Sequence, residues 1–198
     1  MKNIFLFLII FSIISFIFLL LYFRDSYLYD GSIHLGIFSL AMYLLWKNDL
    51  KTTLHDLGFP GSIKNALVYS VAGLGAIFIL LFILGILSLT LGFNDQNKIS
   101  EKIADLPIYI LVFAIFFAPL SEELFFRAFL VPRIGVLFSA FVFGLVHLAY
   151  GSVIEVVGVT LVGIILALVF KTSKSITPCI LTHMIYNLLS IIAMRLLM

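Results

Sequence analysis

Long runs of apolar residues limit this chain to folds in which helices cross a lipid bilayer. A transmembrane helix needs about 20 consecutive, mostly apolar residues. The 198 residues of the chain are 63% hydrophobic and only 11% charged, whereas about a quarter of the residues of a soluble domain are charged. The net charge of +2 is too small to indicate a nucleic-acid partner. The sequence therefore predicts an all-α integral membrane protein.

Seven apolar runs, separated by short polar breaks, are candidate transmembrane helices. They cover residues 4–23, 28–46, 66–92, 107–130, 135–150, 153–170 and 175–197. The first is longer than the roughly 7–15 apolar residues of a secretory signal and lacks a small-residue cleavage site, so we expect it to be retained. Residues 47–65 are expected at the membrane interface, and the charged stretch 93–106 is expected to be a solvated loop. The expected fold is a bundle of about seven transmembrane helices around an intramembrane polar cavity.

The distribution of basic residues predicts the orientation, because cytoplasmic loops are enriched in Lys and Arg. With the N-terminus inside, eight basic residues face the cytoplasm and four face outward. They are Lys2, Lys47, Lys51, Lys64, Arg127, Arg133, Lys171 and Lys174 inside, against Arg24, Lys98, Lys102 and Arg195 outside. Without Arg127 and Arg133, which lie within or beside a span, the bias is six against four. We expect a multi-pass protein of the plasma membrane.

A group of charged residues interrupts the fourth apolar run. Charged side chains near a bilayer centre cost roughly 2.5–3.5 kcal/mol each, so they indicate function by default. Glu123 and Arg127 are four residues apart, on one helical face, and are expected to form an ion pair. Glu122 is rotated by about 100° from Glu123 and is left available as a general base. The alternative is a helix end at the interface, with Arg127 extending to the lipid headgroups.

Polar residues of two further helices are expected at the same depth. At a rise of about 1.5 Å per residue, Glu122 would lie about 12 Å inside the cytoplasmic face, His147 about 18 Å, and His183 and Asn187 about 12 and 18 Å. His183 and Asn187 share a helical face, and the alternative for this pair is a hydrogen bond between helices. The alternative for His147 is a core histidine. Together the four residues provide a base for activating water and donors for an oxyanion.

The remaining polar residues are expected to have simpler roles. His34 and His55 lie at span edges and are interpreted as surface groups. Glu155 starts the sixth span near the outer face, where a hydrated carboxylate is expected. Cys179 is interpreted as a small apolar core residue.

Three motifs in the second half of the chain resemble those of a known family. They are Glu-Glu-x-x-x-Arg at Glu122, Glu123 and Arg127, Phe-x-x-x-His at Phe143 and His147, and His-x-x-x-Asn at His183 and Asn187. In this order, with spans of suitable length between them, they resemble the CPBP family of intramembrane proteases. This family includes the CAAX prenyl endopeptidases and the Abi-type proteins linked to bacteriocin processing and self-immunity. The resemblance covers residues 105–195, so we divide the chain into N-terminal spans of unassigned role at 1–104 and a protease core at 105–198.

The resemblance implies a role for each motif residue. Glu122 and His147 would activate the attacking water, while His183 and Asn187 would bind it and stabilise the oxyanion. Glu123 and Arg127 would support the site, and Phe143 would pack beside it. The cavity would open toward the cytoplasm.

A metal cofactor is left open by the sequence. Glu122, His147 and His183 are a candidate ligand set for a divalent metal such as zinc, with a free coordination position. No His-Glu-x-x-His motif is present, however, and a metal-free mechanism in which Glu122 is the base uses the same residues.

The leading hypothesis is thus an intramembrane endopeptidase. Its partners would be the lipid bilayer and a substrate that is either a prenylated CAAX-type protein or a small hydrophobic, bacteriocin-like peptide. The alternatives are a non-catalytic immunity or scaffold protein of the same fold, and a small transporter with a Glu/His proton relay.

Overall fold

The structure, a computed structural model, describes residues 28–48, 57–58, 61–93, 95 and 97–196. The first predicted span, 4–23, and His55 lie outside these residues. The described chain is helical, without strands. Its elements are α2 (Leu28–Asn48), α3 (Ile63–Thr90), α4 (Asn97–Ala104), α5 (Ile108–Glu123), η1 (Leu124–Leu130), α6 (Val131–Val146), η2 (His147–Tyr150), α7 (Val153–Ser173) and α8 (Thr177–Leu196).

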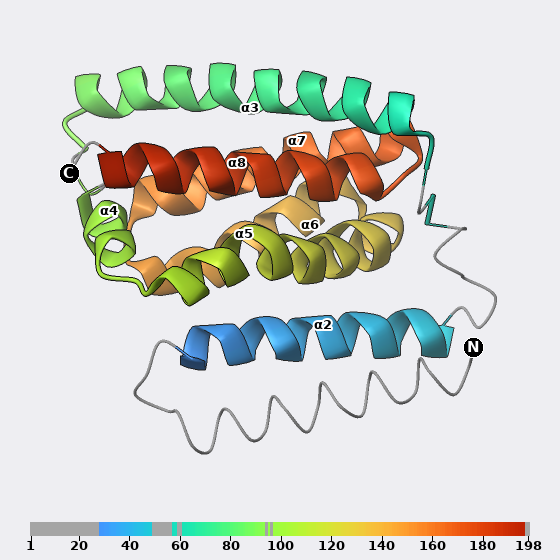
Figure 1. The fold of residues 1–198 in the computed structure, drawn as a ribbon. Helices are drawn as coiled ribbons and strands as arrows, with labels where there is room; N and C mark the ends of the chain where they lie inside the picture. The colour runs from blue at the N-terminus through green and yellow to red at the C-terminus, as the bar shows by residue number, and fades with distance from the viewer. Residues whose placement is uncertain (1–27, 49–56, 59–60, 94, 96, 197–198) are drawn as a thin grey trace.

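The long helices pack side by side in a bundle (Figure 1). α2 contacts α5 and η1, α5 contacts α8, and α8 contacts both α3 and α7. α6 packs on α7 and η1. In Figure 1, α2 and α5 run in one direction, whereas α3 and α8 run in the opposite direction. The outer face of α3 exposes large apolar side chains such as Val71, Phe82 and Leu89, which suits contact with lipid.

Four helical stretches of the described chain are long and apolar enough to cross a membrane. They are Ile63–Thr90, Ile108–Val146, Val153–Ser173 and Thr177–Leu196. The all-α membrane class is confirmed, but the count of seven spans is not. The second predicted span, 28–46, falls on α2 (Leu28–Asn48), of which His34–Leu44 is a shorter apolar helical stretch. The fourth and fifth predicted spans fall on α5 with η1 and on α6, which follow one another in the chain and are separated by a break in the helix at Gly135.

Two local irregularities occur between α5 and the end of α6. Residues Leu124–Leu130 form a π-helix, a rare geometry that often marks functional sites. The hydroxyl of Ser139 in α6 donates a hydrogen bond to the carbonyl oxygen of Phe126 at 2.7 Å. One backbone carbonyl group of the π-helix thereby gains a partner. Gly135 has φ 81° and ψ 174°, so the helix is broken there. A positive φ favours glycine, and the break lets α6 lie beside η1.

Small residues bring α6 and α7 close together. A Cβ added at Gly163 of α7 would lie 3.1 Å from Phe143 Cδ1 and 3.2 Å from Ala140 Cβ. A Cβ at Gly144 of α6 would collide with the hydroxyl of Thr160. Small residues of α3, Ser70 and Gly73, are buried as well. This close approach places the carbonyl groups of α7 next to the side chains of η1.

The prediction of a solvated loop at 93–106 is wrong, because the segment contains the helix α4. Ile99 is buried, and α4 packs on α8. Lys98 Nζ donates to the carbonyl oxygen of Gly151 at 3.0 Å, and Arg195 of α8 donates to the carbonyl oxygen of Ile103 at 3.2 Å. The charges of the segment are therefore on one face of a docked amphipathic helix.

At the opposite end of the bundle, part of the predicted interfacial stretch is fixed to the turn between α7 and α8. Ser175 Oγ donates to the carbonyl oxygen of Gly58 at 2.6 Å, and the backbone N–H of Ile176 donates to that of Leu57 at 3.0 Å. Gly58 has φ 68°, and a Cβ there would lie 2.7 Å from the carbonyl oxygen of Lys174. This turn sets where α8, which carries two candidate site residues, begins.

Candidate active site

An ion pair lies at the centre of the bundle. Glu123 Oε2 is 3.0 Å from Arg127 Nε, and the two side chains are 0% and 1% exposed. The predicted ion pair is therefore present. Arg127 Nη2 also donates to the carbonyl oxygen of Gly163 at 3.4 Å, and its Cζ lies 4.4 Å from the centroid of the Phe143 ring. Because the two charges are opposite, the pair as a whole brings no net charge into the apolar interior.

The contact between the two ions is close but poorly aligned. Among the described residues, Glu123 Oε2 and Arg127 Nη1 have no partner that meets hydrogen-bond geometry, although the pair is within ion-pair distance. The 3.0 Å separation gives strong electrostatic attraction, whereas the poor alignment weakens the hydrogen bond. Charge, rather than a bidentate hydrogen bond, holds the pair.

The second oxygen of Glu123 holds His183. Its Oε1 lies 2.8 Å from His183 Nδ1. A carboxylate only accepts hydrogen bonds, so the partner assigns the proton to Nδ1. His183 is buried, with 6% exposed, and its other nitrogen, Nε2, points toward Glu122 Oε2 at 3.7 Å. Glu123 therefore fixes both the tautomer and the direction of the imidazole.

Glu122 lies between two histidines. Its Oε2 faces His183, and its Oε1 lies 3.4 Å from Nδ1 of His34 on α2. The Glu122 side chain is 8% exposed, so the carboxyl group is enclosed in the bundle. Among the described residues, Glu122 therefore pairs with these two histidines, whereas Arg127 pairs with Glu123.

Phe143 separates and contacts the two predicted histidines. Its ring centroid is 4.9 Å from that of His147 and 6.1 Å from that of His183, with edge-on geometry in both cases. His147 Nδ1 lies 2.8 Å from the carbonyl oxygen of Phe143, which assigns the proton to Nδ1 and makes Nε2 an acceptor. His147 begins the 3₁₀ turn η2 rather than continuing the predicted span.

Asn187 lies one helical turn beyond His183 and joins α8 to α5. Its Nδ2 donates to the carbonyl oxygen of Ala114 at 2.9 Å. His183 and Asn187 both bond to α5, so they share one face of α8, as the spacing predicted. An amide nitrogen carries two hydrogens, which leaves Asn187 a second donor.

The structure therefore brings most of the predicted residues together. Glu122 contacts His183, Glu123 joins Arg127 to His183, and Phe143 touches both His147 and His183. Sequence reasoning missed His34, which was interpreted as a surface group. Its only sequence signal was a histidine at the start of an otherwise apolar run.

The candidate metal set does not fit a metal ion in this arrangement. Among the described residues, no group of three or more His, Cys, Asp and Glu side chains is arranged to hold one. His183 and Glu122 approach each other, but His147 does not join them in such a group.

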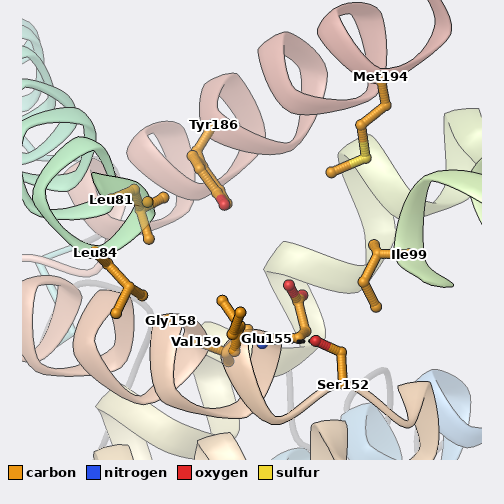
Figure 2. A pocket seen from close by; sticks show the side chains of 11 residues that line it. Leu81, Leu84, Ile99, Ser152, Glu155, Gly158, Val159, Tyr186 and Met194 are labelled. Carbon is orange, nitrogen blue, oxygen red and sulfur yellow. Dashed lines mark hydrogen bonds between the residues drawn. The ribbon is translucent and has the colours of Figure 1, made fainter. Parts of the chain in front are cut away.

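A separate cavity of about 200 Å³ lies between α3, α4, α7 and α8. Figure 2 shows Tyr186 of α8 and Glu155 of α7 on facing walls, with Leu81 and Leu84 of α3 beside them. Glu155 is thus part of a cavity wall rather than a fully hydrated surface carboxylate. The predicted site residues are absent from the lining. Cys179 is a buried thiol, as expected of a small core residue.

Comparisons with known proteins point to a family for the same region. Residues 104–189 match the family model described as type II CAAX prenyl endopeptidase Rce1-like. A protein of Mycoplasma capricolum subsp. capricolum, described as uncharacterized, is 28% identical over 111 residues, which cover 50% of this chain and 33% of that protein. The chain thus spans about a third of this relative. No solved structure matches the chain significantly.

Proposed function

Because residues 104–189 match the family model of the type II CAAX prenyl endopeptidase Rce1-like proteins, we propose that this integral membrane protein is an intramembrane endopeptidase. It hydrolyses a peptide bond in a prenylated CAAX-type protein or in a small hydrophobic peptide. The protein resides in the plasma membrane, and its site opens toward the cytoplasm. Residues 105–198 carry the chemistry.

The observation that carries this proposal is the enclosed pair of Glu122 and His183. The 3.7 Å between Glu122 Oε2 and His183 Nε2 is too long for a direct hydrogen bond but suits a water that contacts both. Glu122 takes a proton from this water as its oxygen attacks the peptide carbonyl. The same carboxyl group then delivers the proton to the leaving amine, so no proton is lost or gained. The Nε2 acceptor of His147 helps to hold the water.

The tetrahedral oxyanion needs donors that are already in place. Asn187 supplies the amide hydrogen that Ala114 does not use. His183 binds the attacking water at Nε2 while the carboxylate of Glu123 holds its Nδ1–H, as in a carboxylate–histidine pair. Donors arranged in advance contribute most when water is excluded, and the burial of this cluster provides that condition.

The test is cleavage by the purified full-length chain in proteoliposomes. Substrates are peptides ending in a farnesylated Cys-a-a-X sequence, the same peptides without farnesyl, and hydrophobic bacteriocin-leader peptides, with products identified by mass spectrometry. We expect the wild type to cleave members of this panel. Glu122→Gln should lower kcat by at least about 100-fold, since general acid–base catalysis contributes this much or more. His183→Ala and Asn187→Ala should also lower kcat.

Glu155→Gln is the matched control, because it neutralises an acid in the other cavity and should leave kcat unchanged. Full activity of both Glu122→Gln and His183→Ala would overturn the proposed roles. Absence of cleavage across the panel by folded wild-type protein would favour the non-catalytic scaffold.

A further inference from the structure

His34 comes from a helix outside the matched domain but reaches the proposed general base. α2 ends at Asn48, well before residue 104, where the family match begins. The imidazole Nδ1 lies 3.4 Å from Glu122 Oε1 and 3.4 Å from Ser121 Oγ. The side chain of His34 is 20% exposed, so it lies largely within the bundle. A histidine at the protein surface would not be expected to contact Glu122, so the position of His34 calls for an explanation.

The neighbours of Nδ1 determine which way the hydrogen bond runs. Ser121 donates its single hydroxyl hydrogen to the carbonyl oxygen of Ala118 at 2.8 Å, so toward His34 its oxygen is an acceptor. The ionised carboxylate of Glu122 is also only an acceptor. With two acceptors around it, Nδ1 carries the imidazole hydrogen. Its hydrogen bond is with Ser121 Oγ, and the same N–H lies at ion-pair distance from Oε1 of Glu122.

Aromatic contacts fix α2 against α5 in the register that this contact needs. The ring of His34 packs edge-on against Phe113, with centroids 5.8 Å apart. One turn later, Phe38 packs against Phe117 at 5.5 Å. Further along, buried Ala41 and Met42 cluster with Leu124 of η1. The imidazole is therefore held by a packed helix interface rather than by a loop.

We infer that His34 is a positioning residue for Glu122. By presenting its N–H to Oε1, it keeps the carboxylate turned so that Oε2 faces His183 and the attacking water. Catalytic hydrogen bonds are often long without substrate and tighten when it binds, which agrees with the 3.4 Å separation. This inference rests on the proposed function, in which Glu122 is the base.

Two variants separate the donated hydrogen bond from the ring packing. His34→Asn keeps a nitrogen donor near the place of Nδ1 but removes the ring. His34→Phe keeps a ring against Phe113 but removes the donor. Both are assayed as full-length protein in proteoliposomes on a peptide that the wild type cleaves, with folding checked by gel filtration and by the unfolding midpoint.

We expect His34→Phe to lower kcat by about 10- to 100-fold, because small misplacements of a catalytic group have effects of this size. KM should change little, since His34 acts through Glu122 and not on the substrate. His34→Asn should recover most of the lost kcat. If His34→Phe does not fold, His34→Leu replaces it in the same comparison.

Three results would overturn the inference. They are wild-type kcat in His34→Phe, an equal loss of kcat in both folded variants, and an effect confined to KM. Failure of the proposed function is recognised separately, because Glu122→Gln would then cleave as fast as the wild type.

Discussion

Glu123 is shared between a guanidinium and an imidazole, so its effects on stability and on catalysis are connected. Its Oε2 faces Arg127, and its Oε1 accepts from His183. A carboxylate left alone in an apolar interior is strongly unfavourable. Loss of Arg127 would leave this charge without its fixed counterion, next to the imidazole that Glu123 holds in the site.

Arg127→Met should therefore destabilise the protein by about 3–5 kcal/mol, the usual effect of removing one partner of a buried pair. The double variant Glu123→Gln/Arg127→Met should be less destabilised, since no unpaired charge remains. The unfolding midpoints in detergent, compared with the wild type, measure both. A double variant less stable than Arg127→Met would show that the pair is not held by charge.

The residues that sequence alone could predict are those connected by helical spacing. Glu123 and Arg127 are four apart, as are His183 and Asn187, and the structure places each pair on one face. His34 was missed because it contacts Glu122, a residue on another helix that lies 88 positions later in the chain. A single chain carries no pattern for such a contact, which depends on the register of α2 against α5.

At the scale of elements, the close packing of α6 on α7 should control the site through Phe143. Gly163→Val places new atoms where a Cβ alone would already lie 3.1 Å from Phe143 Cδ1. Overpacking of this kind typically destabilises by about 1–3 kcal/mol. We also expect lower peptidase activity, because Phe143 contacts both His147 and His183. The unfolding midpoint and kcat are the two measurements.

Gly75→Val is the control for this substitution. Gly75 lies in α3, and nothing lies within 4 Å of the Cβ it would gain. Its unfolding free energy should stay within about 0.5 kcal/mol of the wild type, as for most surface substitutions. Equal effects at Gly75 and Gly163 would show that helix propensity, and not packing, is responsible.

The start of α7 depends on a carboxylate outside the helix. Partial desolvation raises the pKa of the Asp95 carboxyl group. Hydrogen bonds from the Val153 N–H and the Ser152 hydroxyl lower it, and together they outweigh the desolvation, so the pKa lies below its ordinary value of 3.8. A carboxyl group whose pKa is lower in the folded state stabilises the fold above its unfolded pKa. That contribution is lost as the pH falls through the folded pKa.

We expect the wild type to have a higher unfolding midpoint than Asp95→Asn at pH 6, and the difference to shrink below about pH 4. Thermal unfolding in detergent between pH 6 and pH 3 measures it. Glu101→Gln, at an exposed position of α4, is the control for general acid effects. A difference that grew on acidification would contradict the role of Asp95.

The segment around Asp95 also shows why one element was not predicted. Residues 93–106 are rich in charge, which favours a loop when composition is considered alone. α4 has only eight residues, and isolated helices of this length are unstable in water. Its existence depends on tertiary contacts: buried Ile99 and the hydrogen bonds made by Lys98 and Arg195.

At the scale of the whole molecule, the prediction of orientation can be tested with single cysteines. Cys179 is 0% exposed and should not react in the folded protein. The positive-inside rule places Lys171 in the cytoplasm and α4 outside. In intact cells, a membrane-impermeant maleimide should therefore label Glu101→Cys but not Lys171→Cys, and both should react after permeabilisation. The reverse labelling pattern would invert the predicted topology.

Because η1 is a π-helix, the geometry of the site depends on the number of residues in Leu124–Leu130 as well as on their identity. Deleting one residue from Leu124–Leu130 would favour an ordinary α-helix in place of the π-helix. A related sequence shortened between Glu123 and Arg127 would place the arginine three rather than four residues after the glutamate and so change the geometry of their ion pair. In an alignment with related sequences, a one-residue gap here should therefore be treated as a change of site geometry.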